Sequence, residues 1–192
     1  MALSSRELPL PTVPSISSLS QAHATLLHCW NRLLRSDRAP LPQGPLTGQT
    51  TQIAEGMQQF RDWLQKWERG FSEFLTIEFD TMDTAALTQC RVLKANHLAC
   101  IIMVSDPETR PDQSAAMAIE FRAIVELAEA VLQARITSPT PSASNATPVD
   151  ANLVTSGLDV YGPLQVVLAQ CTVMELWSRA HQLYKMNRVN LS

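Results

Sequence analysis

The chain has few cysteines, and none of them is spaced as a zinc ligand. Its four cysteines are Cys29, Cys90, Cys100 and Cys171, with no Cys-x-x-Cys pair and no histidine at zinc-finger spacing. Each lies in an apolar stretch with helical periodicity, where a free cysteine is ordinarily a small buried hydrophobe. We therefore expect no metal site and no disulfide framework, which would require a secreted protein.

A secretory leader and a membrane-spanning run are also lacking. Residues 1–14 are rich in proline and contain only scattered apolar residues, so they have no apolar core of leader length. No uncharged apolar run reaches the roughly 20 residues that a membrane-spanning helix needs. We expect an intracellular protein that does not enter a membrane.

The chain lacks an excess of positive charge and the short motifs of common enzymes. Its 15 basic residues face 18 acidic ones, so direct binding to nucleic acid is not expected. Its 6 glycines form no phosphate-cradling loop, and there is no Gly-x-Ser-x-Gly turn. No cofactor is therefore expected, and the sequence favours a non-enzymatic protein without deciding the question.

What the sequence does contain is helical periodicity over most of its length. Apolar residues recur at spacings of three and four, and no alternating pattern bounded by turns predicts a strand. We expect an all-α fold, an irregular bundle of five to six helices forming a single domain over residues 18–188. Residues 1–17 are expected to be a disordered or loosely docked arm. Residues 137–156, rich in Pro, Ser and Thr, are expected to be a flexible loop.

One of the expected helices has the character of a bundle's centre. From Leu98 onward the segment 84–104 is apolar on nearly every side, which is typical of a buried helix. Gly70, inside another apolar stripe, predicts a bend or a close crossing of two helices. The expected helices cover residues 18–35, about 51–75, about 84–104, about 112–135, 164–171 and, after a bend, a last segment through Tyr184.

Glu78, Asp80 and Asp83 form the densest acidic cluster in the sequence. Carboxylates spaced as Asp-x-x-Asp can hold Mg²⁺, and terpene-cyclising helical enzymes use acidic motifs of this general kind. The favoured interpretation is simpler. Charges at a helix end are solvated, and Asp80 or Asp83 caps the helix that follows.

His97, on the expected central helix, is the other candidate for chemistry. A histidine titrates near neutral pH and can act as a general acid or base, but a hydrogen-bonded core histidine is the favoured interpretation. Trp63 and Trp67 are the candidates for contact with a partner or ligand. Core packing is the favoured role of the stripe that contains Trp67, whereas Trp63 lies off that stripe and is expected to be exposed.

Three stretches together resemble the C-terminal half of the regulatory domain of fungal zinc-cluster transcription factors. They are residues 60–67, residues 92–98 followed by 121–128, and residues 162–164 leading to Cys171 and Ala180. In the second, Leu93, Lys94, His97 and Leu98 match the family's Leu-Lys-x-x-His-Leu run. The chain departs from the family because it has no six-cysteine module, no basic linker before residue 18 and no Asp-Pro in the bend after Cys171.

The resemblance implies a nuclear or cytoplasmic regulator that acts through protein contacts, with control of a specialised-metabolism pathway as its setting. The expected partner is a full-length transcription factor or a second copy of the chain. DNA binding is not carried over, because the module that performs it is missing. The alternative is a small helical enzyme or ligand-binding protein of specialised metabolism, with a closed apolar cavity reached by His97 or by the acidic cluster. A shortened gene product without function is a third interpretation, which the regular core pattern argues against.

Overall fold

The computed structural model describes residues 10–12, 15–36, 49–105, 117–137 and 157–189. Over this part of the chain the fold is all-α, as predicted, with six α-helices, one short 3₁₀ turn and no strand. Compared with the expected segments, the second helix runs on to Glu78, and the helix expected at 164–171 begins at Tyr161. The elements are α1 (Leu19–Ser36), α2 (Gln49–Glu78), η1 (Phe79–Thr81), α3 (Thr84–Val104), α5 (Ala118–Thr137), α6 (Tyr161–Gln170) and α7 (Met174–Val189).

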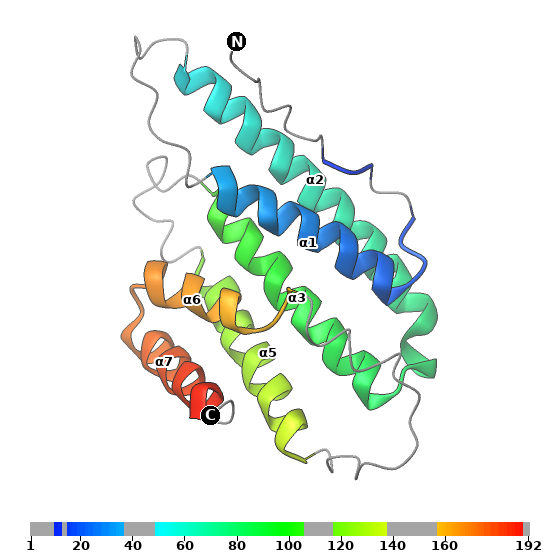
Figure 1. The fold of residues 1–192 in the computed structure, drawn as a ribbon, viewed down its shortest axis with the longest axis vertical. Helices are drawn as coiled ribbons and strands as arrows, with labels where there is room; N and C mark the ends of the chain where they lie inside the picture. The colour runs from blue at the N-terminus through cyan, green and yellow to red at the C-terminus, as the bar shows by residue number, and fades with distance from the viewer. Residues whose placement is uncertain (1–9, 13–14, 37–48, 106–116, 138–156, 190–192) are drawn as a thin grey trace, which may run out of the picture.

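Helix α3 is the centre of the bundle, which confirms the prediction made from its apolar composition. It packs against α1, α2, α5 and α6, and Figure 1 shows it running between the α1–α2 pair and the α5–α7 group. Helix α7 completes the second group by packing on α5 and α6. Buried residues cover most of the circumference of α3, and the face with Leu87, Arg91 and Lys94 is only partly buried. The buried residues are Cys90, Val92, Leu93, Ala95, Asn96, His97, Ala99, Cys100, Ile102 and Val104.

Side-chain caps begin two of the helices. Ser18 Oγ accepts a hydrogen bond from the N–H of Gln21 at 3.2 Å, which is the contact that an N-cap residue makes. Gln21 Oε1 in turn accepts a hydrogen bond from the N–H of Ser17, one residue before the cap, at 2.9 Å. At the start of α3, Asp83 Oδ1 accepts from the N–H of Ala86 at 2.7 Å.

The apolar stripe of α2 faces the core, as expected. Its buried members are Phe60, Leu64, Trp67, Phe71 and Phe74. Helix α2 continues through Gly70, and a Cβ added there would lie 3.6 Å from Ile16 Cγ1, an ordinary van der Waals contact. Gly70 therefore faces the segment before α1, and the predicted close crossing of two helices is not found there.

Part of the expected N-terminal arm lies against α2. Leu10 and Ile16 pack on the core, and the Pro11 carbonyl oxygen accepts a hydrogen bond from Trp63 Nε1 at 2.7 Å. The described residues of the arm are therefore docked rather than disordered. The loop expected at 137–156 lies outside the described residues, except for Thr137 at the end of α5.

The chain enters α6 beside the middle of α3 and the end of α5. Asn96 Nδ2, buried on α3, donates to the carbonyl oxygen of Asp159 at 3.0 Å and to that of Val92 at 2.8 Å. The Asp159 carboxylate in turn binds Arg135, near the end of α5, with Nη2 and Oδ1 2.7 Å apart. Asp159 thus connects α3, α5 and α6. None of the described helices is long and apolar enough to cross a membrane.

Candidate functional site

A charged cluster of Glu68, Lys94 and His97 sits where α2 crosses α3. The two oxygens of the Glu68 carboxylate contact different groups: Oε1 forms an ion pair with Lys94 Nζ, and Oε2 lies 3.2 Å from His97 Nδ1. The other ring nitrogen of His97, Nε2, lies 3.0 Å from the carbonyl oxygen of Leu64. Glu68 and Lys94 are partly exposed, whereas the His97 side chain is 4% exposed.

These contacts determine the protonation of His97. A carbonyl oxygen can only accept, so Nε2 carries a hydrogen and donates it to Leu64. Burial lowers the pKa of His97 to about 4, although the Glu68 carboxylate and the Leu64 carbonyl both act to raise it. The ring is therefore neutral at pH 7, and its Nδ1 lone pair faces a carboxylate oxygen. Neither of those two atoms has a hydrogen-bond partner in the structure.

The three acidic candidates lie elsewhere. Glu78, Asp80 and Asp83 are exposed at the junction of α2 and α3, and Asp83 serves as the N-cap of α3. His97 is fourteen residues further along the helix from Asp83, which is roughly 20 Å at 1.5 Å per residue. The structure therefore does not bring His97 and the acids together. Within the described residues, no three histidine, cysteine or acidic side chains are grouped to hold a metal ion.

Both tryptophan candidates are buried. Trp67 is fully enclosed, and its ring stacks on that of Phe71 with centroids 4.8 Å apart. Trp63 is only 6% exposed, so the expectation that it is exposed is wrong. The physical reason is the segment before α1, because Pro11 covers the indole and accepts its N–H. The spacing of apolar residues within α2 cannot show that a segment far away in the sequence buries Trp63.

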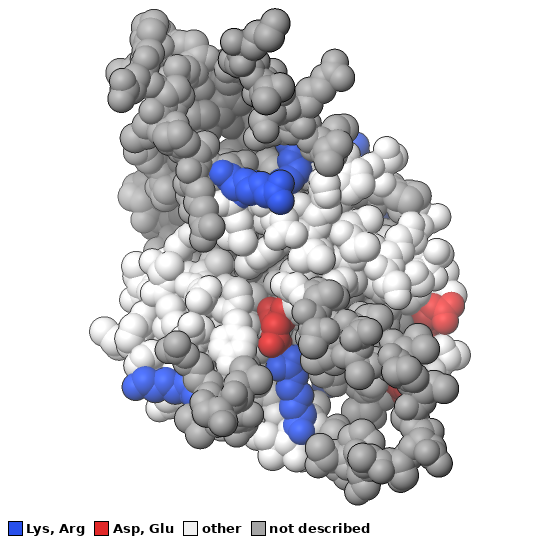
Figure 2. Space-filling model, viewed as in Figure 1, with Lys and Arg blue, Asp and Glu red and all other residues white. Residues whose placement is uncertain are grey.

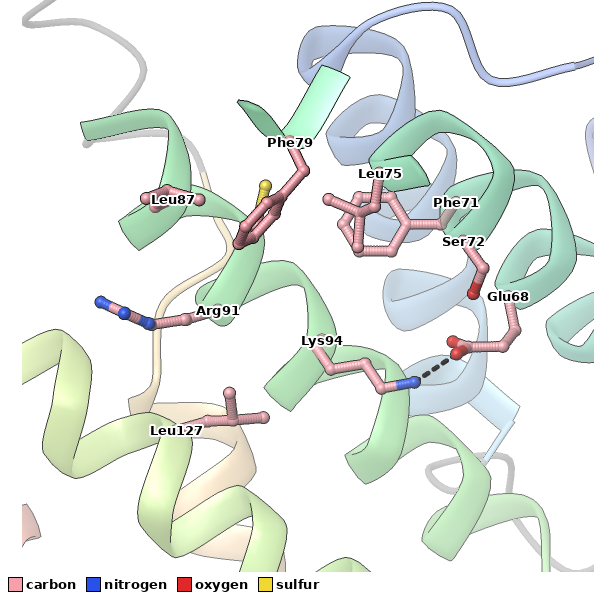
Figure 3. Close-up of a pocket in the computed structure, with 10 residues that line it drawn as sticks. Glu68, Phe71, Ser72, Leu75, Phe79, Leu87, Arg91, Lys94 and Leu127 are labelled. Carbon is pink, nitrogen blue, oxygen red and sulfur yellow. Dashed lines mark hydrogen bonds and ion pairs between the residues drawn. The ribbon is translucent and has the colours of Figure 1, made fainter. Parts of the chain in front are cut away.

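A groove opens between α2, η1, α3 and α5, next to the charged cluster. Its volume is about 300 Å³. Figure 3 shows the side chains that surround it, with Phe79 and Leu75 facing one another across its upper part. Phe79 is 58% exposed, which is unusual for so large an apolar side chain. The apolar side chains of this α2–α3–α5 groove are Phe71, Leu75, Phe79, Leu87 and Leu127.

Charged side chains occupy the other part of the groove lining. They are Glu68, Lys94 and Arg91. In Figure 3 Lys94 extends toward Glu68, whereas Arg91 extends to the opposite side of α3, above Leu127 of α5. Sequence reasoning missed Glu68, Arg91 and Leu127. The only local signal is that Arg91 and Lys94 interrupt an otherwise apolar helix.

A second hollow lies near the start of α1 and the end of α2. Its volume is about 460 Å³, and Glu78 and Asp83 are among its lining residues, together with Leu19, Phe74 and Met82. His97 does not line either hollow. The closed cavity reached by His97, which the enzyme alternative expects, is not among the hollows described for this part of the chain.

Charge does not single out a surface on the view drawn in Figure 2. The basic and acidic side chains of the described residues are scattered there, and near the middle an acidic side chain lies directly against a basic one. The groove is therefore a candidate because of its shape and its apolar walls. Comparisons of the chain with protein-family models, with curated proteins and with solved structures found no match.

Proposed function

We propose that this protein is a non-enzymatic regulator that acts by binding a partner protein, and that the α2–α3–α5 groove is the contact surface. The observation that carries the proposal is Phe79, a large apolar side chain 58% exposed at the rim of an apolar groove. Apolar surface concentrated around a groove is typical of sites for protein contact. Leu75 and Leu87, both half-buried, extend the same apolar wall.

The shape of the groove favours a partner helix. Amphipathic helices bind such grooves by inserting apolar side chains from positions i, i+3 or i+4, and i+7. A volume of about 300 Å³ is at the lower limit of small-molecule pockets and suits a few inserted side chains. The walls come from three separate helices, so a partner helix lying along α3 would touch α2 and α5 at once.

The candidate catalytic residues support a binding role over catalysis. The Nε2–H of His97 is engaged by a backbone carbonyl, and its ring is enclosed in the core. Asp83 is occupied as a helix cap. General acid–base catalysis needs a titrating group within hydrogen-bond reach of a substrate, and neither residue is placed for that role.

The resemblance to zinc-cluster regulators suggests what the partner is. We propose a helical segment of a full-length transcription factor as the occupant of the groove, with nuclear control of a specialised-metabolism pathway as the setting. The exposed apolar rim fits a protein that modifies the action of a larger relative. A second copy of this chain is the competing occupant, and the experiment below separates the two.

The test places a photo-crosslinking amino acid at position 79, at the groove rim, and separately at position 119. Ile119, 76% exposed at the start of α5, is the matched exposed apolar control. In native cells we expect position 79 to crosslink to a helical segment of a transcription factor. Position 119 should not, and Leu87→Glu should abolish the product while leaving the circular-dichroism melt unchanged. Absence of a crosslink at position 79, an equal yield from position 119, or crosslinking only to a second copy would overturn the proposal.

A further inference from the structure

Arg91 is a half-buried cation of the groove, and it has no acidic partner in the part of the chain that the structure describes. Arg91 is one of the residues that line the α2–α3–α5 groove, and its side chain extends on the side of Leu127 (Figure 3). Among the described residues, the carboxylates that form ion pairs are Glu68, Glu129 and Asp159, and none of them pairs with Arg91. Glu68, the only acid of the groove lining, is shared by Lys94 and His97. The groove therefore holds one more positive charge than negative.

Arginine is suited to recognise a carboxylate in such a place. Its planar guanidinium can donate two parallel hydrogen bonds to one carboxylate, and such bonds are stronger than neutral ones. A helix that covers the groove excludes water from Arg91, which strengthens the attraction to an acid and makes an unpaired or like charge unfavourable. The same arrangement rejects a partner with lysine or arginine at that position.

The spacing along α3 sets where that acid must be. Leu87 and Arg91 are four residues apart, so they lie on one face of α3, roughly 6 Å apart along its axis. One turn of a helix packed along α3 spans about the same length. An apolar side chain of the partner that meets Leu87 would therefore be followed by a side chain opposite Arg91 three or four positions away.

We infer that the groove selects an acidic amphipathic helix, with an aspartate or glutamate one turn from an apolar anchor, and that Arg91 binds this carboxylate. The inference rests on the proposed function, because it names the kind of partner that the groove accepts. Arg91 sets specificity, and the apolar walls supply the remaining contact.

The experiment uses a displayed library of amphipathic helical peptides, randomised on one face and selected on the full chain at low salt. Groove binders are defined as peptides that lose binding to Leu87→Glu. We expect them to be enriched in Asp or Glu one turn from an apolar residue. Arg91→Gln should weaken such a peptide about tenfold, as expected for loss of a charge-assisted hydrogen bond. A twin peptide with Gln in place of the acid should not be affected. Arg122→Gln, an exposed arginine of α5, is the control variant.

The outcomes separate this inference from the proposed function. Groove binders that are neutral or basic at that position, or acidic binders that Arg91→Gln does not weaken, would overturn the inference and leave the groove as a docking site. A selection that yields no peptide sensitive to Leu87→Glu would overturn both. Thermal melts of each variant check that the fold is retained.

Discussion

The imidazole of His97 lies against the indole of Trp67, with ring centroids 5.1 Å apart and planes inclined by 20°. Trp67 also donates its Nε1–H to Thr25 Oγ1 at 3.1 Å. The stacked rings therefore connect α2 to α3, and the hydrogen bond of Trp67 connects α2 to α1. The position of His97 in this stack makes it a packing residue, and its removal should be measured as a loss of stability.

Replacing His97 by alanine should lower the free energy of unfolding by about 2–4 kcal/mol. The change leaves a cavity beside Trp67 and removes the hydrogen bond to the Leu64 carbonyl. Urea unfolding measures the effect. His181, which stacks on Trp177 in a half-buried position, is the matched control, and His181→Ala should lower the free energy of unfolding by less than about 1 kcal/mol. Equal losses for the two variants would contradict the assignment.

The stability of the protein should fall as the pH is lowered from about 6.5 toward 4. Burial holds the pKa of His97 at about 4 in the folded state, below its ordinary value of 6.5, so the unfolded state binds the proton more tightly. Stability that depends on the neutral ring is complete above 6.5 and is lost as the pH falls through the folded pKa.

His97→Leu isolates this effect. Burial also lowers the pKa of His23, so His23 acts in the same direction in both proteins. Glu68 and Lys94, which face the ring, remain in both as well. The difference in unfolding free energy between pH 7 and pH 4.5 should be smaller for His97→Leu than for the unchanged chain. A larger or equal difference in the variant would refute the assignment.

The acidic cluster should act on helix stability and not on metal binding. Asp83→Ala removes the N-cap of α3 and should lower the free energy of unfolding by about 1 kcal/mol. Asp80→Ala, at an exposed position three residues earlier, should change it by less than about 0.5 kcal/mol. Added Mg²⁺ should not shift the melting temperature of the unchanged chain. A shift that disappears in both variants would instead restore the magnesium interpretation.

Two glycines should respond in opposite directions to alanine. A Cβ at Gly162 would lie 2.6 Å from Trp30 Cζ2, so Gly162→Ala should force the indole to move and lower the free energy of unfolding by about 1–3 kcal/mol. Gly70 has room for a Cβ within α2, so Gly70→Ala should raise it by about 0.5–1 kcal/mol. Thermal and urea unfolding of the two variants measure both values, and the same sign for both would contradict the described packing.

The fold could be predicted largely because its signals are local. The all-round apolar pattern after Leu98 placed α3 at the centre, and the Asp83 cap and the α2 stripe follow from spacings of three or four residues. Trp63 shows where this fails. Its burial depends on Pro11, 52 residues away, and no pattern within α2 reports that contact.

The candidate site was harder to predict than the fold for the same reason. The groove is made by side chains of α2, α3 and α5 that have no common spacing in the sequence. His97 was correctly favoured as a hydrogen-bonded core residue, but its carboxylate neighbour Glu68 lies on another helix. The exposure of Phe79 could not be predicted from the sequence either, because it depends on where α2 ends and η1 changes the direction of the chain.

The ion pair of Arg135 and Asp159 holds together the two places where the chain leaves α5 and enters α6. The hydrogen bond from Asn96 adds a second anchor, so the start of α6 is tied both to α3 and to the end of α5. Loss of one of these contacts would therefore still leave the entry of the chain into α6 held by the other.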